Sequence, residues 1–309
     1  MIDTLVIIGV GLIGGSLARA LRRSGVVGEI VGVGRSAANL EAAVDLGVVD
    51  RFEFDAAKAV RGADMVVVAV TLGASAEILE TIGPALDENT FVTDVGSTKL
   101  SVVVSARAAL GARFPNFVPG HPIAGTELSG VKASFAELFE DHKVILTPLP
   151  ETREEALHAV ASLWRATGAS VVEMDAAHHD QVLAATSHLP HLLAYTLVDM
   201  LAAAEDSGEI FKFAAGGFRD FTRIASSNPE MWRDIILANR EAVLPLCEVY
   251  ADRFGALRRA IEAGDGAALE AIFERAKDVR DRSFISPHPS NWPVGRVRYG
   301  RSGGGDGDQ

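Results

Sequence analysis

Near its N-terminus the chain carries the stretch Val6-Ile7-Ile8-Gly9-Val10-Gly11-Leu12-Ile13-Gly14, and the expected arrangement of its N-terminal half follows from it. A strand-like apolar run leads into glycines with G-x-G-x-x-G spacing, and Gly15 then opens a helix-forming segment. Gly9 permits a tight turn, Gly11 lets backbone approach a pyrophosphate, and Gly14 lets the helix pack on the strand. The helix start offers unpaired N–H groups to phosphate. The stretch therefore predicts a dinucleotide site that includes Leu12 and Ile13.

Outward from this turn, short β-branched runs alternate with helical segments to about residue 172. Strands are predicted at Thr4-Ile8, Glu29-Val33, Met65-Val68, Phe91-Asp94, Asn116-Pro119, Lys143-Thr147 and Ser170-Val172. Helices are predicted at Gly14-Ser24, Ala37-Leu46, Ala74-Ile82, Leu100-Leu110 and Thr152-Thr167. Nearly continuous apolar strands are typical of a mainly parallel sheet that is covered on both faces. We therefore predict an α/β fold, with an N-terminal Rossmann-type doubly wound domain over residues 1–174.

The pattern changes after Asp175. From Ala176 to about Phe284 the sequence is rich in Ala, Leu, Glu and Arg at helical spacing, with almost no β-type runs. This predicts an all-α domain over residues 175–285, beginning with a long alanine-rich helix to about Asp206 that serves as a hub helix or a dimer seam. The tail, residues 286–309, is rich in Pro, Gly, Arg and Ser, and we expect it to be disordered.

Composition limits the partners. The 29 basic and 41 acidic residues give a net charge of −12 without a basic block, which disfavours nucleic acid and anionic membranes as partners. No signal peptide or sufficiently long apolar span is recognisable, so we expect a cytoplasmic protein. The single cysteine, Cys247, permits no intramolecular disulfide. An anionic substrate would have to be held by a few placed cations.

The end of the second predicted strand bears on the choice of cofactor. NAD enzymes usually place an acidic residue about twenty residues after the glycine turn, where it binds the ribose 2′-hydroxyl. This chain has Gly34 there, followed by Arg35 and Ser36, which suit a 2′-phosphate. The sequence favours NADP over NAD without excluding NAD.

Three further clusters carry polar side chains suited to chemistry. Two follow strands, where open α/β sheets place ligands: Asp94-Val95-Gly96-Ser97-Thr98-Lys99 and Gly120-His121-Pro122-Ile123-Ala124-Gly125-Thr126-Glu127. The third is in the helical part: Ser187-His188-Leu189-Pro190-His191, then Gly216-Gly217-Phe218-Arg219-Asp220-Phe221-Thr222-Arg223. With the glycine turn, these motifs resemble the prephenate/arogenate (cyclohexadienyl) dehydrogenase family of tyrosine biosynthesis over about residues 1–285.

The resemblance implies an oxidative decarboxylation. Prephenate or arogenate would lose a hydride to NAD(P), a proton from its ring hydroxyl and then carbon dioxide, which leaves 4-hydroxyphenylpyruvate or tyrosine. His121 has a near-neutral reference pKa and suits the base that accepts the hydroxyl proton. Ser97 would orient His121 or the substrate hydroxyl, although it also suits the N-cap of the following helix.

Four further residues are candidates for substrate binding. Arg223 offers a guanidinium fork for a carboxylate, unless it pairs with Asp220 or another acid. His191 would lie at the mouth of the site, with His188 as its competitor, and Thr126 would contact the substrate side chain. His178-His179-Asp180 looks like a metal motif, but no third ligand accompanies it at metal spacing, and we expect no metal.

The resemblance also implies a homodimer formed by the helical domains, and a site between the two domains. Two other functions fit parts of the sequence. A β-hydroxyacid dehydrogenase would use a lysine on the second domain, for which Lys212 is the nearest candidate. A nucleotide-sensing module without turnover would leave His121, His191 and Arg223 unexplained.

Overall fold

The computed structural model describes residues 2–284. They form two compact units, one that extends to Arg240 and one that begins at Glu241. The predicted tail, residues 286–309, lies outside the described residues.

The main sheet has six parallel strands in the order β3-β2-β1-β4-β5-β6. The strands are β1 (Ile2–Ile8), β2 (Val27–Val33), β3 (Arg51–Glu53), β4 (Met65–Val68), β5 (Phe91–Asp94) and β6 (Phe117–Val118). The order reverses between β1 and β4, where doubly wound sheets bind ligands. This confirms the predicted Rossmann-type fold. The edge strand β3 was not predicted because its three residues include two charged ones and show no apolar run.

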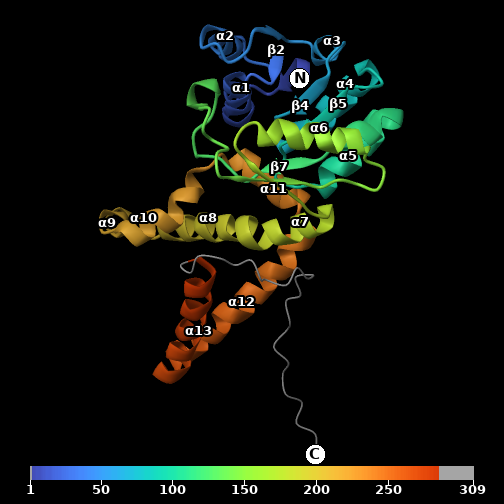
Figure 1. Ribbon diagram of the computed structural model, residues 1–309. Helices are drawn as coiled ribbons and strands as arrows, with labels where there is room; N and C mark the ends of the chain where they lie inside the picture. Colours follow the sequence, from blue (N-terminus) through green and yellow to red (C-terminus); the bar gives the residue numbers. More distant parts are fainter. Residues whose placement is uncertain (1, 285–309) are drawn as a thin grey trace, which may run out of the picture. The chain divides into compact units, whose positions relative to one another are not determined.

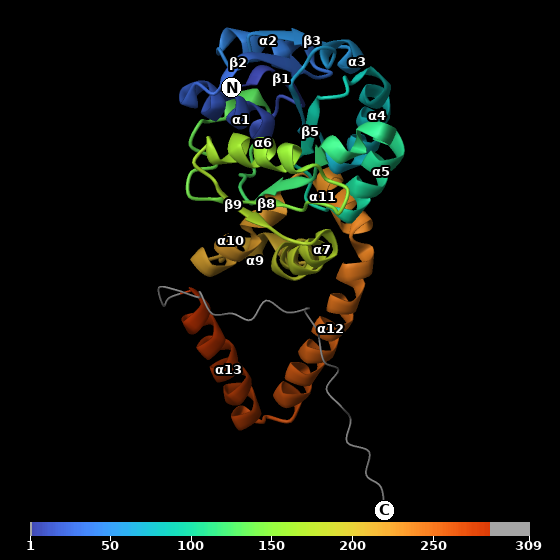
Figure 2. The ribbon, with the colours of Figure 1, turned by 45° about the vertical axis from the view of Figure 1, so that its right-hand side comes forward.

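Helices cover both faces of this sheet (Figure 1) (Figure 2). One core contains residues of α1 (Leu12–Ser24), α2 (Ala37–Asp45) and α6 (Glu154–Arg165), and the other contains residues of α3 (Ala56–Ala59), α4 (Leu72–Ile82) and α5 (Leu100–Leu110). Alternate residues of β1 enter opposite cores: Leu5 and Ile7 the first, Val6 and Ile8 the second. Burial on both faces explains the uninterrupted apolar strands.

A second, separate sheet of three strands follows the first along the chain. It has the order β7-β8-β9, with β7 (Gly120–Pro122), β8 (Lys143–Leu146) and β9 (Ser170–Glu173). β7 runs antiparallel to β8 and pairs His121 with Ile145. His121 was expected in the turn after a strand; instead it lies within a strand of its own. Backbone pairing on β8 fixes this residue more firmly than a turn would.

All described elements after Asp175 are helical, as predicted. The first compact unit contains α7 (Ala176–Leu183), a π-helical turn (Ala184–His188), α8 (Leu189–Ala202), α9 (Ser207–Lys212), α10 (Gly216–Thr222), a 3₁₀ turn (Arg223–Ser226) and α11 (Pro229–Ala238). The last two helices are α12 (Arg240–Glu262) and α13 (Gly266–Phe284). Among residues 2–284, no helix is both long and apolar enough to cross a membrane.

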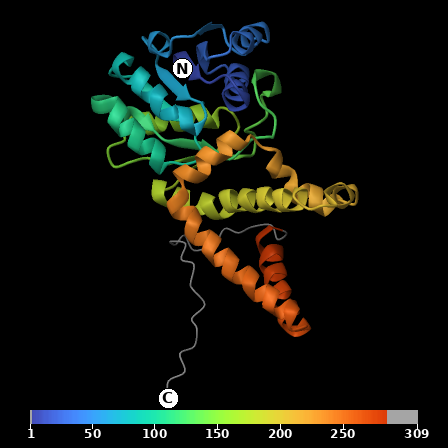
Figure 3. The same cartoon turned by 180° about the vertical axis from the view of Figure 1, so that it is seen from behind.

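The long helix predicted from Ala176 is one continuous helical run to Ala202 (Figure 3). A π-helical turn interrupts its regular geometry in the middle. Pro190 lies two residues after this turn, in the first turn of α8, and a proline cannot donate the backbone hydrogen bond of a regular helix. The widened turn accommodates this proline without ending the helix.

Candidate active site

The glycine turn has the geometry that a pyrophosphate requires. Gly9 has a φ of +103°, and a Cβ there would lie 2.3 Å from the carbonyl oxygen of Ala69. A Cβ on Gly14 would lie 2.2 Å from the carbonyl oxygen of Gly9. Around Gly11, by contrast, a Cβ would meet no atom within 4 Å. Two glycines are thus required by the fold, while Gly11 borders open space at the start of α1, next to the N–H groups of its first turn.

The end of β2 offers the second part of a nucleotide site. A Cβ on Gly34 would meet Leu40 at an ordinary contact distance of 3.4 Å, so packing does not explain the missing acid. Arg35 is exposed, and Ser36 is the N-cap of α2, where its Oγ accepts a hydrogen bond from the N–H of Asn39 at 3.3 Å. The Ser36 hydroxyl hydrogen therefore remains available to a ligand.

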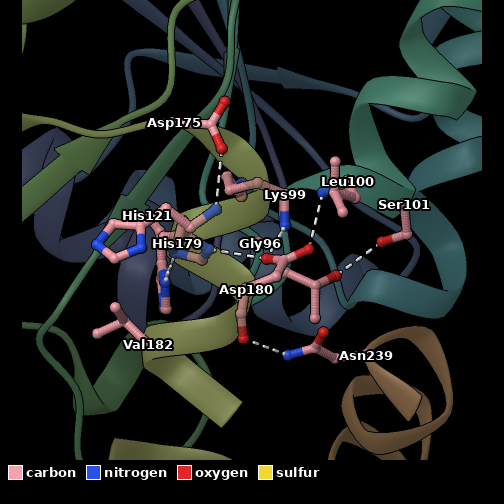
Figure 4. Close-up of polar contacts among 12 residues, drawn as sticks. Gly96, Lys99, Leu100, Ser101, His121, Asp175, His179, Asp180, Val182 and Asn239 are labelled. Atoms are coloured by element: carbon pink, nitrogen blue, oxygen red, sulfur yellow. Dashed lines mark hydrogen bonds and ion pairs between the residues drawn. The ribbon is translucent and has the colours of Figure 1, made fainter. Parts of the chain in front are cut away.

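His121 is one end of a buried chain of three side chains (Figure 4). Its Nδ1 lies 2.9 Å from Nε2 of His179 on α7. Nδ1 of His179 lies 2.8 Å from Oδ1 of Asp180. His179 and Asp180 were considered in the sequence only as metal ligands, and both contribute to this chain instead.

Asp180 also caps the N-terminus of α5. Its Oδ1 accepts from the N–H of Lys99 at 2.8 Å, and its Oδ2 from the N–H of Leu100 at 3.0 Å. The N-cap position of α5 is Lys99, and no cap hydrogen bond comes from its side chain. The alternative role of Ser97 as the helix cap is therefore wrong. An aspartate that is distant in sequence satisfies these N–H groups, and Ser97 lies half-buried in the preceding loop.

A buried ion pair fixes the backbone just before His121. Nζ of Lys99 donates to Oδ2 of Asp94 and to the carbonyl oxygen of Gly120, both at 2.5 Å. Oδ1 of Asp94 accepts from the N–H of Gly120 at 3.1 Å. Both backbone groups of Gly120 are thus held, which positions the first residue of β7. Lys99 and Asp94 belong to a cluster that the sequence analysis identified, but neither was assigned a role.

Electrostatics keep these histidines uncharged. Burial, together with the positive charge of Lys99, lowers the pKa of His121 well below its ordinary value. Burial also lowers the pKa of His179, although Asp180 acts in the opposite direction. An uncharged imidazole retains one bare ring nitrogen, so His121 is in the protonation state of a general base at neutral pH.

The two other candidate histidines both contact the ring of Trp232. Nδ1 of His188 accepts from Nδ2 of Asn239 at 3.0 Å, and the His188 side chain is fully buried. The ring of His191 stacks on Trp232 with the centroids 3.5 Å apart, and its Nδ1 donates to the carbonyl oxygen of Ser187. His188 therefore presents Nε2–H as a donor, and His191 presents Nε2 as an acceptor.

Arg223 stands at the end of α10 and reaches the loop after β7. Its Nη1 lies 2.9 Å from Oε1 of Glu127. Of the two ion-pair alternatives considered in the sequence, the partner is thus another acid and not Asp220. Thr126 is exposed beside Glu127, and its Oγ1 accepts from the N–H of Leu128 at 3.3 Å. Arg223 thus binds the residue that follows Thr126, and no hydrogen bond of Arg223 or Thr126 reaches His121, His179 or Asp180.

A Rossmann-type sheet with an open glycine turn, together with a buried and uncharged histidine, defines an NAD(P)-dependent oxidoreductase. The chain belongs to the prephenate dehydrogenase family. The family model of its nucleotide-binding domain matches residues 17–173, and that of its dimerization domain matches residues 175–275.

Individual relatives agree with this assignment. The chain is 39% identical over 282 residues to cyclohexadienyl dehydrogenase from Zymomonas mobilis, covering 89% of this chain and 94% of the relative. It is 37% identical to prephenate dehydrogenase from Aquifex aeolicus, solved with hydroxyphenyl propionate and NAD+, with a TM-score of 0.85 over 91% of this chain and 98% of that one. An arogenate dehydrogenase structure from Synechocystis gives a TM-score of 0.75 at 29% identity over 90% of this chain and 99% of that one.

Two sequence features had suggested other chemistry: Lys212, and the metal-like motif at His178-His179-Asp180. Lys212, the candidate base of a β-hydroxyacid dehydrogenase, is exposed at the end of the short helix α9. In the described part of the chain, no group of three or more His, Cys, Asp or Glu side chains has an arrangement suited to a metal ion.

Proposed function

We propose that this chain catalyses the oxidative decarboxylation of prephenate, arogenate or both, to 4-hydroxyphenylpyruvate or tyrosine. The observation that carries the proposal is the state of His121: buried, uncharged, and held by a hydrogen bond at Nδ1. A base in this state can accept a proton from the ring hydroxyl of the substrate as the carbinol carbon is oxidised. The relatives named for prephenate and for cyclohexadienyl substrates support this chemistry.

We propose that the glycine turn holds the cofactor. The backbone beside Gly11 and the N–H groups of Leu12 and Ile13 would bind the pyrophosphate, while Gly9 and Gly14 maintain the turn. The bound cofactor supplies a hydride acceptor. Arg35 and the Ser36 hydroxyl would bind a ribose 2′-phosphate, and no acid stands at Gly34 to bind a 2′-hydroxyl, which favours NADP over NAD.

We assign substrate binding to five other residues of the motifs that resemble the family. Arg223 would hold a substrate carboxylate with the N–H groups that Glu127 leaves free, since guanidinium has five donors. Ser97 would hydrogen-bond the ring hydroxyl or orient His121. Thr126, His188 and His191 would contact the remainder of the substrate.

We further propose that the chain consists of two domains and forms a homodimer. The family models meet between residues 173 and 175, which supports a nucleotide-binding domain over 1–174 and a helical domain over 175–285. The match to a dimerization domain supports a homodimer. A cytoplasmic location remains a prediction from the sequence.

A turnover assay tests this function. Purified protein is mixed with prephenate or arogenate and with NADP or NAD, and absorbance of the reduced cofactor is followed. We expect turnover with at least one of the two substrates and a higher kcat/KM with NADP. His121→Asn should lower kcat by about 100-fold or more, because a general base contributes that much, and should leave cofactor affinity unchanged. Absence of turnover with both substrates would contradict the proposal, and an active His121→Asn variant would contradict the assignment of the base.

A further inference from the structure

The hydrogen bonds of His179 and Asp180 determine which ring nitrogen of His121 carries its hydrogen. Asp180 uses both carboxylate oxygens to accept from backbone N–H groups, and its Oδ1 also faces Nδ1 of His179 at 2.8 Å. A carboxylate can only accept, so Nδ1 of His179 must carry a hydrogen. His179 is uncharged because burial lowers its pKa, so its Nε2 is bare.

The bare nitrogen of His179 fixes the position of the hydrogen on His121 in turn. A bare Nε2 on His179 can only accept, and Nδ1 of His121 lies 2.9 Å from it. Nδ1 of His121 is therefore the donor and carries the hydrogen of the uncharged ring. Nε2 of His121 is left bare, which is the nitrogen free to face a substrate.

We propose that His179 and Asp180 are positioning residues that hold His121 in the Nδ1–H tautomer, with Nε2 ready to accept the hydroxyl proton. This inference rests on the proposed role of His121 as the base. When the substrate O–H bond breaks, its proton binds Nε2, and the imidazolium keeps its Nδ1–H bond to His179. The negative charge of Asp180, relayed through His179, then faces the new positive charge.

Because Asp180 is bound to the N-terminus of α5, it holds His179 and, through it, His121 in place. Its carboxylate caps α5 through the N–H groups of Lys99 and Leu100, at the positive end of the helix dipole. His179 and Asp180 are fully or almost fully buried, so water does not compete for these hydrogen bonds. The ammonium group of Lys99, whose positive charge acts on His179, is bound to Asp94 and Gly120. The orientation of His121 is thus tied to the backbone of two elements.

Two substitutions at His179 separate positioning from packing. His179→Phe fills the space but removes the acceptor, so we expect kcat to fall about 100-fold or more with little change in KM or cofactor affinity. His179→Gln offers an amide oxygen to Nδ1 of His121, and we expect it to recover kcat to within about 10-fold of the original enzyme. His178→Gln, on the same turn of α7 but outside the chain, is the matched control.

Nuclear magnetic resonance gives a readout independent of turnover. In protein with ¹⁵N-labelled histidine, the shifts of the ring nitrogens report which one is protonated, and His121→Asn identifies the His121 signals. We expect hydrogen on Nδ1 in the original protein and in His179→Gln, and a mixture of tautomers in His179→Phe. Hydrogen on Nε2 in the original protein would overturn the proposal.

The outcomes distinguish this inference from the function on which it rests. If His121→Asn loses turnover while His179→Phe turns over normally, the base assignment stands and the positioning role is wrong. If His121→Asn keeps full activity, the base assignment fails and this proposal fails with it. The melting temperature of each variant shows whether folding is intact, and the comparison with His179→Gln holds even if His179→Phe is unstable.

Discussion

At the scale of single residues, one amide fixes the state of His188. Nδ2 of Asn239 donates both to the backbone oxygen of Asp180 and to Nδ1 of His188. An amide nitrogen has two hydrogens, so both bonds form at once, and the proton of His188 must be on Nε2. Burial lowers the pKa of His188 to about 4, so this histidine is an uncharged donor at neutral pH.

This state predicts how stability depends on pH. The folded pKa of His188 lies below the unfolded value of 6.5, so the unfolded chain binds the extra proton as the pH falls between 6.5 and about 4. Stability is fully present above pH 6.5 and is lost toward pH 4. At pH 5 we expect His188 alone to account for about 2 kcal/mol of lost stability, which His188→Asn should remove from the pH dependence.

Chemical denaturation at pH 7.5 and pH 5 measures this difference. His158→Gln, on the exposed side of α6, controls for the loss of a histidine as such. The same pH dependence in the original protein and in His188→Asn would show that His188 does not titrate as described. The comparison uses the change with pH, so a constant destabilisation of the variant does not affect it.

At the scale of elements, different glycines of the turn between β1 and α1 serve folding and cofactor binding. Gly14→Ala puts a Cβ 2.2 Å from the carbonyl oxygen of Gly9, which is backbone and cannot yield, and 2.9 Å from the Cγ2 atom of the buried Ile7 side chain. We expect it to destabilise the protein by about 2 kcal/mol or more. Gly11→Ala meets no protein atom, so stability should change by less than about 0.5 kcal/mol. The methyl group would occupy the space proposed for the pyrophosphate, and cofactor Kd should rise about 10-fold or more.

Melting temperature and cofactor titration of both variants check this prediction. If Gly11→Ala binds NADP and NAD like the original protein, the cofactor does not lie against this glycine. A Gly14→Ala protein of normal stability would show that the turn can rearrange.

Strands and helices could be predicted where a short, continuous stretch of sequence determines them. The bounds of β4, β5 and α5 agree with the sequence prediction because each is a clear run between breaks. The three-residue strand β7 was missed because it is too short to show a period and depends on pairing with β8. The contact between His121 and His179 spans 58 positions and has no local pattern. His121 could be identified as a candidate base, but its partner could not.

At the scale of the whole molecule, the second compact unit carries an apolar stripe. Tyr250, Phe254 and Ile261 are exposed on α12, and with the half-buried Leu257 they follow the spacing i, i+4, i+7 and i+11 of one helix face. A stripe of this kind on a family dimerization domain favours contact with a second copy.

Analytical ultracentrifugation tests the homodimer. We expect sedimentation at twice the chain mass of 32.6 kDa at micromolar concentration. Phe254→Glu with Ile261→Glu would place two charges in the stripe, and we expect it to raise the dimer Kd by about 100-fold or more. Arg253→Glu, one position away and off the stripe, is the control. A monomer of the original protein at these concentrations would contradict the proposal.

The multiple contacts of Asp180 have a consequence for how this enzyme can change over generations. Its carboxylate caps the N-terminus of α5 and accepts from His179. The contact with Asn239 is made by its backbone carbonyl oxygen and does not depend on the side chain. A substitution there removes the cap of α5 and the hydrogen-bond partner of His179 at the same time, so a replacement has to satisfy both demands at once. Viable lineages would have to change His179 and Asp180 together, through intermediates that are both slower and less stable. Variation at this position is therefore expected to be strongly epistatic.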